Sequence, residues 1–114
     1  MPYELTPEVE KQILEFKDKN KFGAAELWDE RGLIPSPENI INSMEQTVNN
    51  SIDRLIDKKA ELSTNTIKSI IKEELQNQKV RLDTEEREFL AETFFELCEI
   101  LQVDIKRELN RYLY

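Results

Sequence analysis

Histidine is missing from all 114 residues, and this absence excludes several kinds of chemistry at once. Without an imidazole the chain cannot build a Ser-His-Asp or Cys-His nucleophile system. The Glu-x-x-His signature of di-iron bundles and the usual zinc sites are excluded for the same reason. Two glycines, at positions 23 and 32, cannot form a glycine-rich phosphate loop. The sequence therefore predicts no catalytic residue, no metal site and no cofactor among these classes.

Cysteine is almost absent as well, because Cys98 is the only one. One thiol excludes an intrachain disulfide and leaves the redox compartment open. Cys98 falls on the apolar side of a predicted helix, which favours a buried structural thiol over a nucleophile. No apolar run approaches membrane-spanning length and no secretory signal opens the chain, so we expect a cytoplasmic protein. A signal peptide that had already been removed would leave the same sequence.

Basic residues are outnumbered, since 16 bases stand against 24 acids and the net charge is -8. Nucleic acids and anionic lipids bind proteins mainly through neutralised phosphates, so an acidic surface repels both. We therefore expect no nucleic-acid partner and no membrane partner. An acidic surface commonly serves solubility, and the sharper alternative is a face that binds a basic protein.

Turn-forming residues are few, and four prolines with two glycines leave little material for a many-stranded β-fold. Apolar residues recur instead at steps of three and four, as in amphipathic helices. Thr6-Pro7-Glu8 and Ser36-Pro37-Glu38 each combine a cap, a first-turn proline and an acid, which predicts two helix starts. We expect the first of these helices to end at Gly23, and Ser63 or Thr64 to cap a third helix.

The stretch 83–101 has the clearest helix signals in the chain. Asp83 can cap the first amides and Glu86 can reach back three residues, which is the spacing of a capping box. An apolar stripe follows it at helical spacing, and its members are Leu90, Phe94, Leu97 and Leu101. This helix is predicted to form the hydrophobic centre of the fold. The sequence predicts a single all-α domain over residues 1–114, a compact bundle of four main helices. Short additional helical pieces are expected near 24–30 and 104–113.

Acidic residues line one face of this central helix. The candidates for binding a basic partner are Glu85, Glu88, Glu92, Glu96 and Glu99. All-α nucleotide pyrophosphohydrolases hold magnesium with helical acids in Glu-Glu-x-x-Glu and Glu-x-x-Asp arrangements. Here position 89 is Phe where that pattern needs an acid, and the second half is missing. A magnesium-dependent hydrolase that uses Glu85, Glu88, Glu92 and Glu96 remains the enzyme alternative.

Apolar and aromatic residues outside the main helices form a second candidate set, namely Trp28, Leu33 and Tyr112. Trp28 and Leu33 lie on an irregular segment, and we expect them to form a lid over one end of the core, with a ligand pocket as the alternative. Tyr112 belongs to an apolar tail that should dock on the bundle. A further hypothesis is a homodimer that buries Trp28, Leu33 and Tyr114, so both a monomer and a homodimer remain open.

Three short motifs carry a resemblance to a known family. They are Arg31-Gly32-Leu33, the helix start Asp83–Glu88 and the closing segment Leu109–Tyr114. Together they resemble a family of small bacterial helical domains of unknown function, numbered 4844, over about residues 28–114, with residues 1–27 outside. The resemblance implies no activity and therefore assigns no catalytic residue. It does imply that the helix start and the tail act together, with the tail packed beside the cap.

The sequence favours a non-enzymatic, protein-binding or regulatory module, for instance an immunity-like protein whose acidic face binds a basic partner. The acidic face, the lack of catalytic side chains and the small size favour this interpretation. The magnesium-dependent hydrolase and the structural homodimer stay open as alternatives.

Overall fold

The computed structural model describes residues 3–78 and 80–113, which fold into helices joined by short connections. The elements are α1 (Pro7–Asp18), α2 (Ala25–Asp29), α3 (Glu38–Asp57), the 3₁₀ turn η1 (Lys59–Glu61), α4 (Thr64–Gln76), α5 (Thr84–Leu101) and α6 (Lys106–Leu113). No strand occurs in the described ranges. The all-α prediction is confirmed, and the short helices α2 and α6 match the two predicted short pieces.

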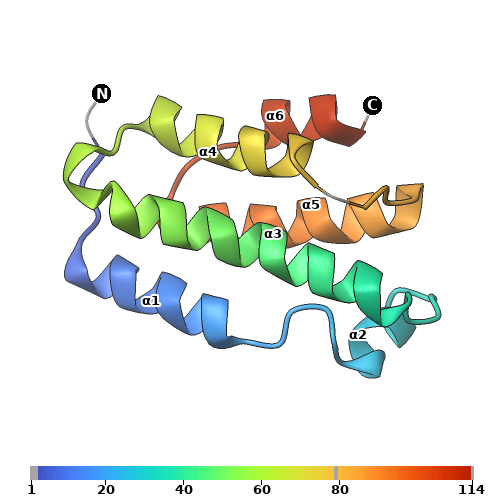
Figure 1. Cartoon of the computed structure of the whole chain (residues 1–114). Helices are drawn as coiled ribbons and strands as arrows, with labels where there is room; N and C mark the ends of the chain where they lie inside the picture. Colours follow the sequence, from blue (N-terminus) through green and yellow to red (C-terminus); the bar gives the residue numbers. More distant parts are fainter. Residues whose placement is uncertain (1–2, 79, 114) are drawn as a thin grey trace.

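The helices pack side by side in an elongated bundle of 41 × 28 × 22 Å. Figure 1 shows α3 crossing the front of the molecule with α5 behind it. Helix α1 contacts both α3 and α5, whereas α4 contacts α3 and α6. Helix α6 also contacts α5, so it closes the bundle between α4 and α5. This position of α6 creates two surface depressions, one against each neighbour.

Helix starts follow the predicted caps, except at α3. Thr6 and Ser63 accept hydrogen bonds from backbone N–H groups three residues ahead, and Asp83 forms a capping box. At α3 the cap residue is Pro37, without a side-chain hydrogen bond, because the Ser36 hydroxyl donates to Glu86 instead. The predicted end of the first helix was also wrong, since α1 stops at Asp18 and not at Gly23.

Helix α5 supplies the centre of the core, as its sequence predicts. The side chains of Leu90, Phe94 and Leu97 are wholly buried, and Leu101 is nearly so. Residues from every other helix join them in one hydrophobic cluster. Further large side chains buried in this cluster are Ile13, Phe22, Trp28, Met44, Ile52, Leu55, Ile67, Ile70 and Ile71. Burial of such side chains is the main favourable term in folding.

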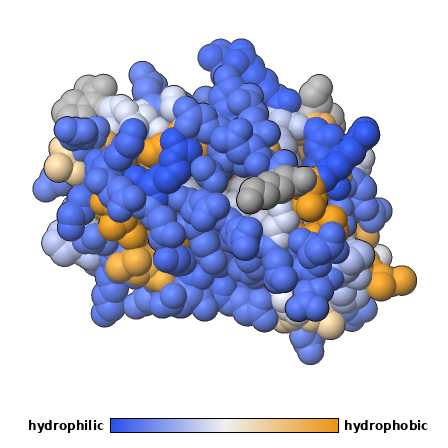
Figure 2. All heavy atoms as spheres, in the orientation of Figure 1, coloured by the Kyte–Doolittle hydropathy of each residue, from blue (hydrophilic) through white to orange (hydrophobic). Residues whose placement is uncertain are grey.

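The outer surface is mostly hydrophilic. The face shown in Figure 2 is covered by polar residues, with small hydrophobic patches that are separate from one another. Within the described residues, the large apolar side chains that stay exposed are Leu14 (41%), Ile34 (89%) and Phe95 (38%). None of the helices in these ranges is long and apolar enough to cross a membrane.

Candidate acidic docking groove on α5 and α6

The outer face of α5 carries the five predicted glutamates. Glu85, Glu88, Glu92, Glu96 and Glu99 are all exposed, because they lie at helical spacing opposite the buried stripe. From Glu85 to Glu99 the face rises through 14 residues, which is roughly 21 Å at 1.5 Å per residue. The face is therefore about four helical turns long.

Glu86 differs from its acidic neighbours because it is 7% exposed. Its Oε1 accepts a 2.9 Å hydrogen bond from the backbone N–H of Asp83, and its other oxygen accepts from the Ser36 hydroxyl. Glu86 thus holds the segment before α3 against the start of α5. It belongs to the framework, whereas the five exposed glutamates form the outer acidic face.

Glu92 already binds a cation from this chain. The Arg31 guanidinium donates to the Glu92 carboxylate and lies 4.7 Å from the centroid of the Phe89 ring. The Glu92 side chain nevertheless stays 65% exposed, so it can accept further hydrogen bonds. The acidic face can therefore hold a guanidinium group over an aromatic neighbour.

A groove runs between α5 and α6 beside this face, with a volume of about 400 Å³. Ala91, Phe95, Leu109 and Leu113 give it apolar walls, and its polar lining residues are Glu88, Glu92, Lys106 and Asn110. Two of the five predicted glutamates are thus placed on an apolar groove. The sequence alone does not predict this groove, although Phe95 lies outside the buried stripe and Leu109 and Leu113 recur one turn apart.

The structure places Trp28 in the core, where it is 1% exposed. Its indole N–H donates a 2.7 Å hydrogen bond to the Phe22 carbonyl, and its ring packs edge-on against Phe89 at 4.9 Å between centroids. Leu33 is half-buried beside it, and its N–H donates to the Trp28 carbonyl. Gly32 makes this turn possible with a φ of 74°, a left-handed conformation that favours glycine.

Trp28 and Leu33 do not line the α5–α6 groove, nor do they line the depression between α4 and α6 that Tyr112 lines. Because the Trp28 ring is buried within one chain, it has no surface to offer to a second copy in this conformation. The largest of the three side chains in the dimer hypothesis is therefore not available at the surface. Tyr114, its third residue, lies outside the described residues.

Tyr112 ties the tail to the start of α5. The Arg87 guanidinium donates to the Tyr112 carbonyl and lies 5.2 Å from the centroid of its ring. The Tyr112 hydroxyl donates to Oε1 of Gln78 at 3.3 Å, and burial raises the pKa of this phenol above its ordinary value. The tail thus packs beside the α5 cap, as the family resemblance implies.

Cys98 is 1% exposed on the inner side of α5. Burial, with a smaller contribution from the Glu108 carboxylate, raises the pKa of its thiol to about 12, and the Lys68 ammonium opposes the shift. A thiol that stays protonated near neutral pH is a weak nucleophile. Its position under α4 and α6 makes Cys98 a packing residue.

Within the described residues, the same acids do not form a metal site. Across the parts of the chain that the structure describes, no group of three Cys, Asp or Glu side chains converges closely enough to hold a metal ion. Glu85, Glu88, Glu92 and Glu96, the residues of the hydrolase alternative, point outward along the helix and do not converge. This arrangement gives the magnesium hypothesis no observation in its favour.

Comparison with known protein families assigns the chain to one of them. Residues 4–114 match the family described as Domain of unknown function (DUF4844). The chain belongs to this family. The match extends the resemblance seen in the sequence, because it also takes in residues 4–27 and therefore α1 of the DUF4844 fold. No curated protein and no solved structure matches the chain significantly.

Proposed function

We propose that this DUF4844 protein is a non-enzymatic binding module that docks a basic, amphipathic helical segment of a partner protein in the α5–α6 groove. The observation that carries the proposal is an exposed aromatic side chain, Phe95, beside an apolar groove on the most acidic helix. The module would act as a regulatory protein, with binding itself as its activity.

Phe95 supplies the apolar anchor of this surface. It is 38% exposed, and it lines the groove together with Leu109 and Leu113. Covering apolar surface contributes about 25 cal/mol per Å², and interface energy concentrates in a few such anchors. A groove of about 400 Å³ has room for one or two apolar side chains of a partner. A helix presents residues of this kind one turn apart, as helix-in-groove complexes require.

The exposed glutamates select the charge of the partner. Lysine or arginine residues that flank the apolar anchor would meet carboxylates along the whole length of the α5 face. Arg31 on Glu92 offers an internal example of the contact that a partner guanidinium would make. Because exposed charges are screened over about 8–10 Å at 0.1–0.15 M salt, binding should weaken as salt rises.

A titration with synthetic peptides tests the proposal. The probe is a Lys/Leu peptide of about 14 residues, long enough for four helical turns, with leucines at helical spacing. We expect saturable amide chemical-shift changes on α5 and α6 that diminish with added salt. The same peptide with glutamates in place of the lysines should cause none of these changes, because like charges repel.

Variants locate the binding surface. Phe95→Ala should lower the affinity for the Lys/Leu peptide about tenfold, which corresponds to roughly 1.4 kcal/mol of binding free energy. The pair Glu88→Gln with Glu96→Gln should lower the affinity as well. Neither glutamate makes an ion pair within the described ranges, so the change removes no salt bridge there. The matched controls on α1 are Leu14→Ala and the pair Glu8→Gln with Glu15→Gln, which should leave affinity unchanged. Equal effects of both sets, or no saturable change, would contradict the proposal.

A further inference from the structure

A second depression lies on the other side of α6, between α4 and α6, with a volume of about 310 Å³. This is near the lower end of the range for small-molecule sites. Its lining differs from that of the docking groove in charge. Lys68 and Lys72 from α4 and Arg111 from α6 face a single carboxylate, Glu108. A protein with a net charge of -8 therefore holds a locally cationic pocket.

The cations of this pocket are poorly neutralised. Lys68 lies 3.8 Å from Oε1 of Glu108, which is a loose contact for an ion pair. Within residues 3–78 and 80–113, Lys72 and Arg111 have no carboxylate within 4 Å. Lys68 and Lys72 are also one helical turn apart on α4, where like charges repel each other. An anion bound between them would relieve this repulsion.

Glu108 presents an unused acceptor in the same place. Its Oε2 is buried and has no hydrogen-bond donor among the described residues. Buried polar atoms nearly always have a partner, and a carboxylate oxygen without one is costly. A donor group on a bound molecule would satisfy this oxygen.

One wall of the pocket is apolar and held in place. Leu75 is buried at its base, and the Tyr112 ring flanks it. The Tyr112 hydroxyl is held by Gln78 and its ring by Arg87, so the wall is formed before a ligand arrives. A preformed wall lowers the ordering cost of binding a small molecule.

We propose that the α4–α6 pocket binds a small organic oxyanion, a phosphate ester or a carboxylate, that also carries a hydroxyl or ammonium donor. Lys68, Lys72 and Arg111 bind the anion, and Glu108 Oε2 accepts from the donor. The carbon skeleton lies against Leu75 and Tyr112. This site is separate from the docking groove, and it would stand if no basic partner existed.

Amide NMR titrations with defined probes test the site. The probes are glycerol 3-phosphate and malate, each an oxyanion with a hydroxyl, together with inorganic phosphate and glycerol. We expect saturable changes confined to residues 65–76 and 108–112 with one or both of the first two. The probe that binds more tightly identifies the anion as a phosphate or a carboxylate. Inorganic phosphate should bind more weakly, and glycerol should not bind.

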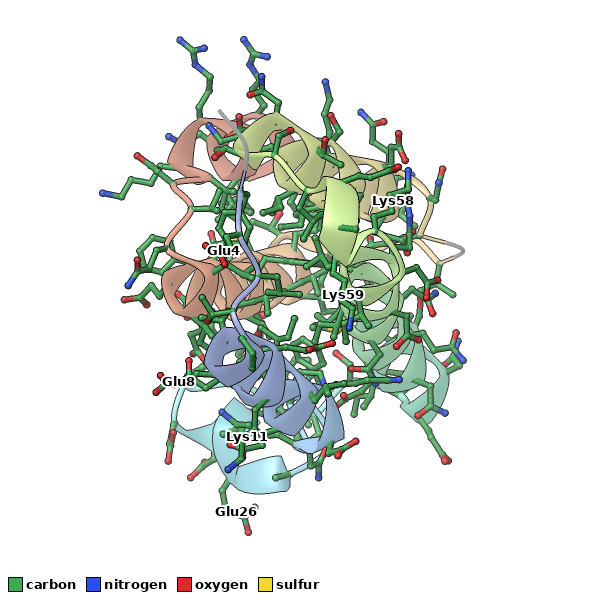
Figure 3. All side chains as sticks on the ribbon, turned by 90° about the vertical axis from the view of Figure 1, so that its left-hand side faces the viewer. Glu4, Glu8, Lys11, Glu26, Lys58 and Lys59 are labelled. Atoms are coloured by element: carbon green, nitrogen blue, oxygen red, sulfur yellow. The ribbon has the colours of Figure 1, made fainter. Side chains whose placement is uncertain are left out.

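Paired variants separate the site from general charge attraction. Lys72→Gln with Arg111→Gln should weaken binding of the preferred probe at least about tenfold, since two charge-assisted contacts are lost. Lys11→Gln with Lys58→Gln removes the same charge elsewhere, on side chains that Figure 3 labels at the end of the molecule toward the viewer. This control should leave affinity unchanged, and equal weakening by the two pairs would overturn the proposal.

Glu108→Met tests the donor contact separately. Removing the carboxylate should strengthen the binding of inorganic phosphate, because a repelling charge is lost. It should also abolish the preference for the hydroxyl-bearing probe over inorganic phosphate. An unchanged preference would refute the role of Glu108. No saturable change in the pocket with either organic probe would overturn the site as a whole. Amide spectra of each variant show whether its fold is retained.

Discussion

Glu86 and Glu88 are two residues apart, yet one is buried and the other faces solvent. The difference arises from helix geometry, because residues two apart lie on different sides of a helix. Lys21, which lies outside the helices, is another charged residue that is turned inward. It is 3% exposed, and its ammonium donates to the carbonyls of Phe16, Lys17 and Lys19 while it lies 3.1 Å from Glu45. Charged residues that turn inward thus hold the framework together, whereas those that turn outward stay exposed to solvent.

Cys98 gives a test at the scale of one residue. In the folded chain the pKa of its thiol is raised to about 12 from an ordinary 9.0, so the native thiol stays protonated at about pH 8. We expect a disulfide reagent to modify the native protein very slowly and the protein in guanidinium chloride at once. Fast modification of the native protein, at the rate of the unfolded chain, would show that Cys98 is not buried.

The same pKa shift predicts how stability depends on pH. The unfolded thiol loses its proton near 9.0 and the folded one near 12, so the unfolded state binds fewer protons between these values. Stability should therefore be intact below about pH 9 and fall as the pH rises toward 12. The groups that act on the thiol are Glu108, which raises its pKa, and Lys68, which lowers it. Cys98→Ala should lose less stability than the parent chain from pH 8 to pH 10 in urea titrations.

At the scale of single helices, the starts were predicted better than the ends. Caps are local, so Thr6, Ser63 and Asp83 could be read from two or three neighbouring residues. The end of α1 depends instead on Lys21, whose ammonium takes the last carbonyls of the helix and pairs with Glu45 on α3. A contact over 24 residues leaves no local sign in the sequence.

The end of α5 gives a test at this scale. Gln102 has a φ of 59°, and the N–H of Val103 donates to the Cys98 carbonyl, as in a glycine-terminated helix. A non-glycine residue costs roughly 1–2 kcal/mol in this conformation. Gln102→Gly should therefore stabilise the protein by about 0.5–1 kcal/mol, after the added entropy of glycine in the unfolded chain. Urea titration measures the change.

Gln12, exposed in the middle of α1, supplies the control. Gln12→Gly should destabilise by about 0.5–1 kcal/mol, because an interior glycine loses backbone entropy on folding. A loss of stability in Gln102→Gly as large as that in Gln12→Gly would mean that residue 102 does not hold the left-handed conformation.

At the scale of the whole molecule, charge is distributed unevenly around α6. The acidic α5 face and its groove lie on one side, and the cationic α4–α6 pocket lies on the other. The sequence predicted the acidic face, because five glutamates repeat along one helix. It could not predict either depression, since each depends on the position at which α6 packs against α5 or α4, and no local sequence pattern specifies that position. Trp28 illustrates the same limit, because its burial depends on Phe22 and Phe89.

We propose above all that a basic partner docks in the α5–α6 groove. Site-specific photo-cross-linking in the source cells tests it most directly, with the photoreactive residue at position 95 or at position 14. Phe95 and Leu14 are matched, since their exposed fractions are 38% and 41% and they lie on different helices. We expect one dominant cross-linked protein from position 95, and this protein should carry a basic amphipathic segment. This product should disappear with Glu88→Gln and Glu96→Gln and be absent from position 14. Equal cross-linking from both positions, or a product insensitive to these glutamates, would show that no basic partner docks in this groove.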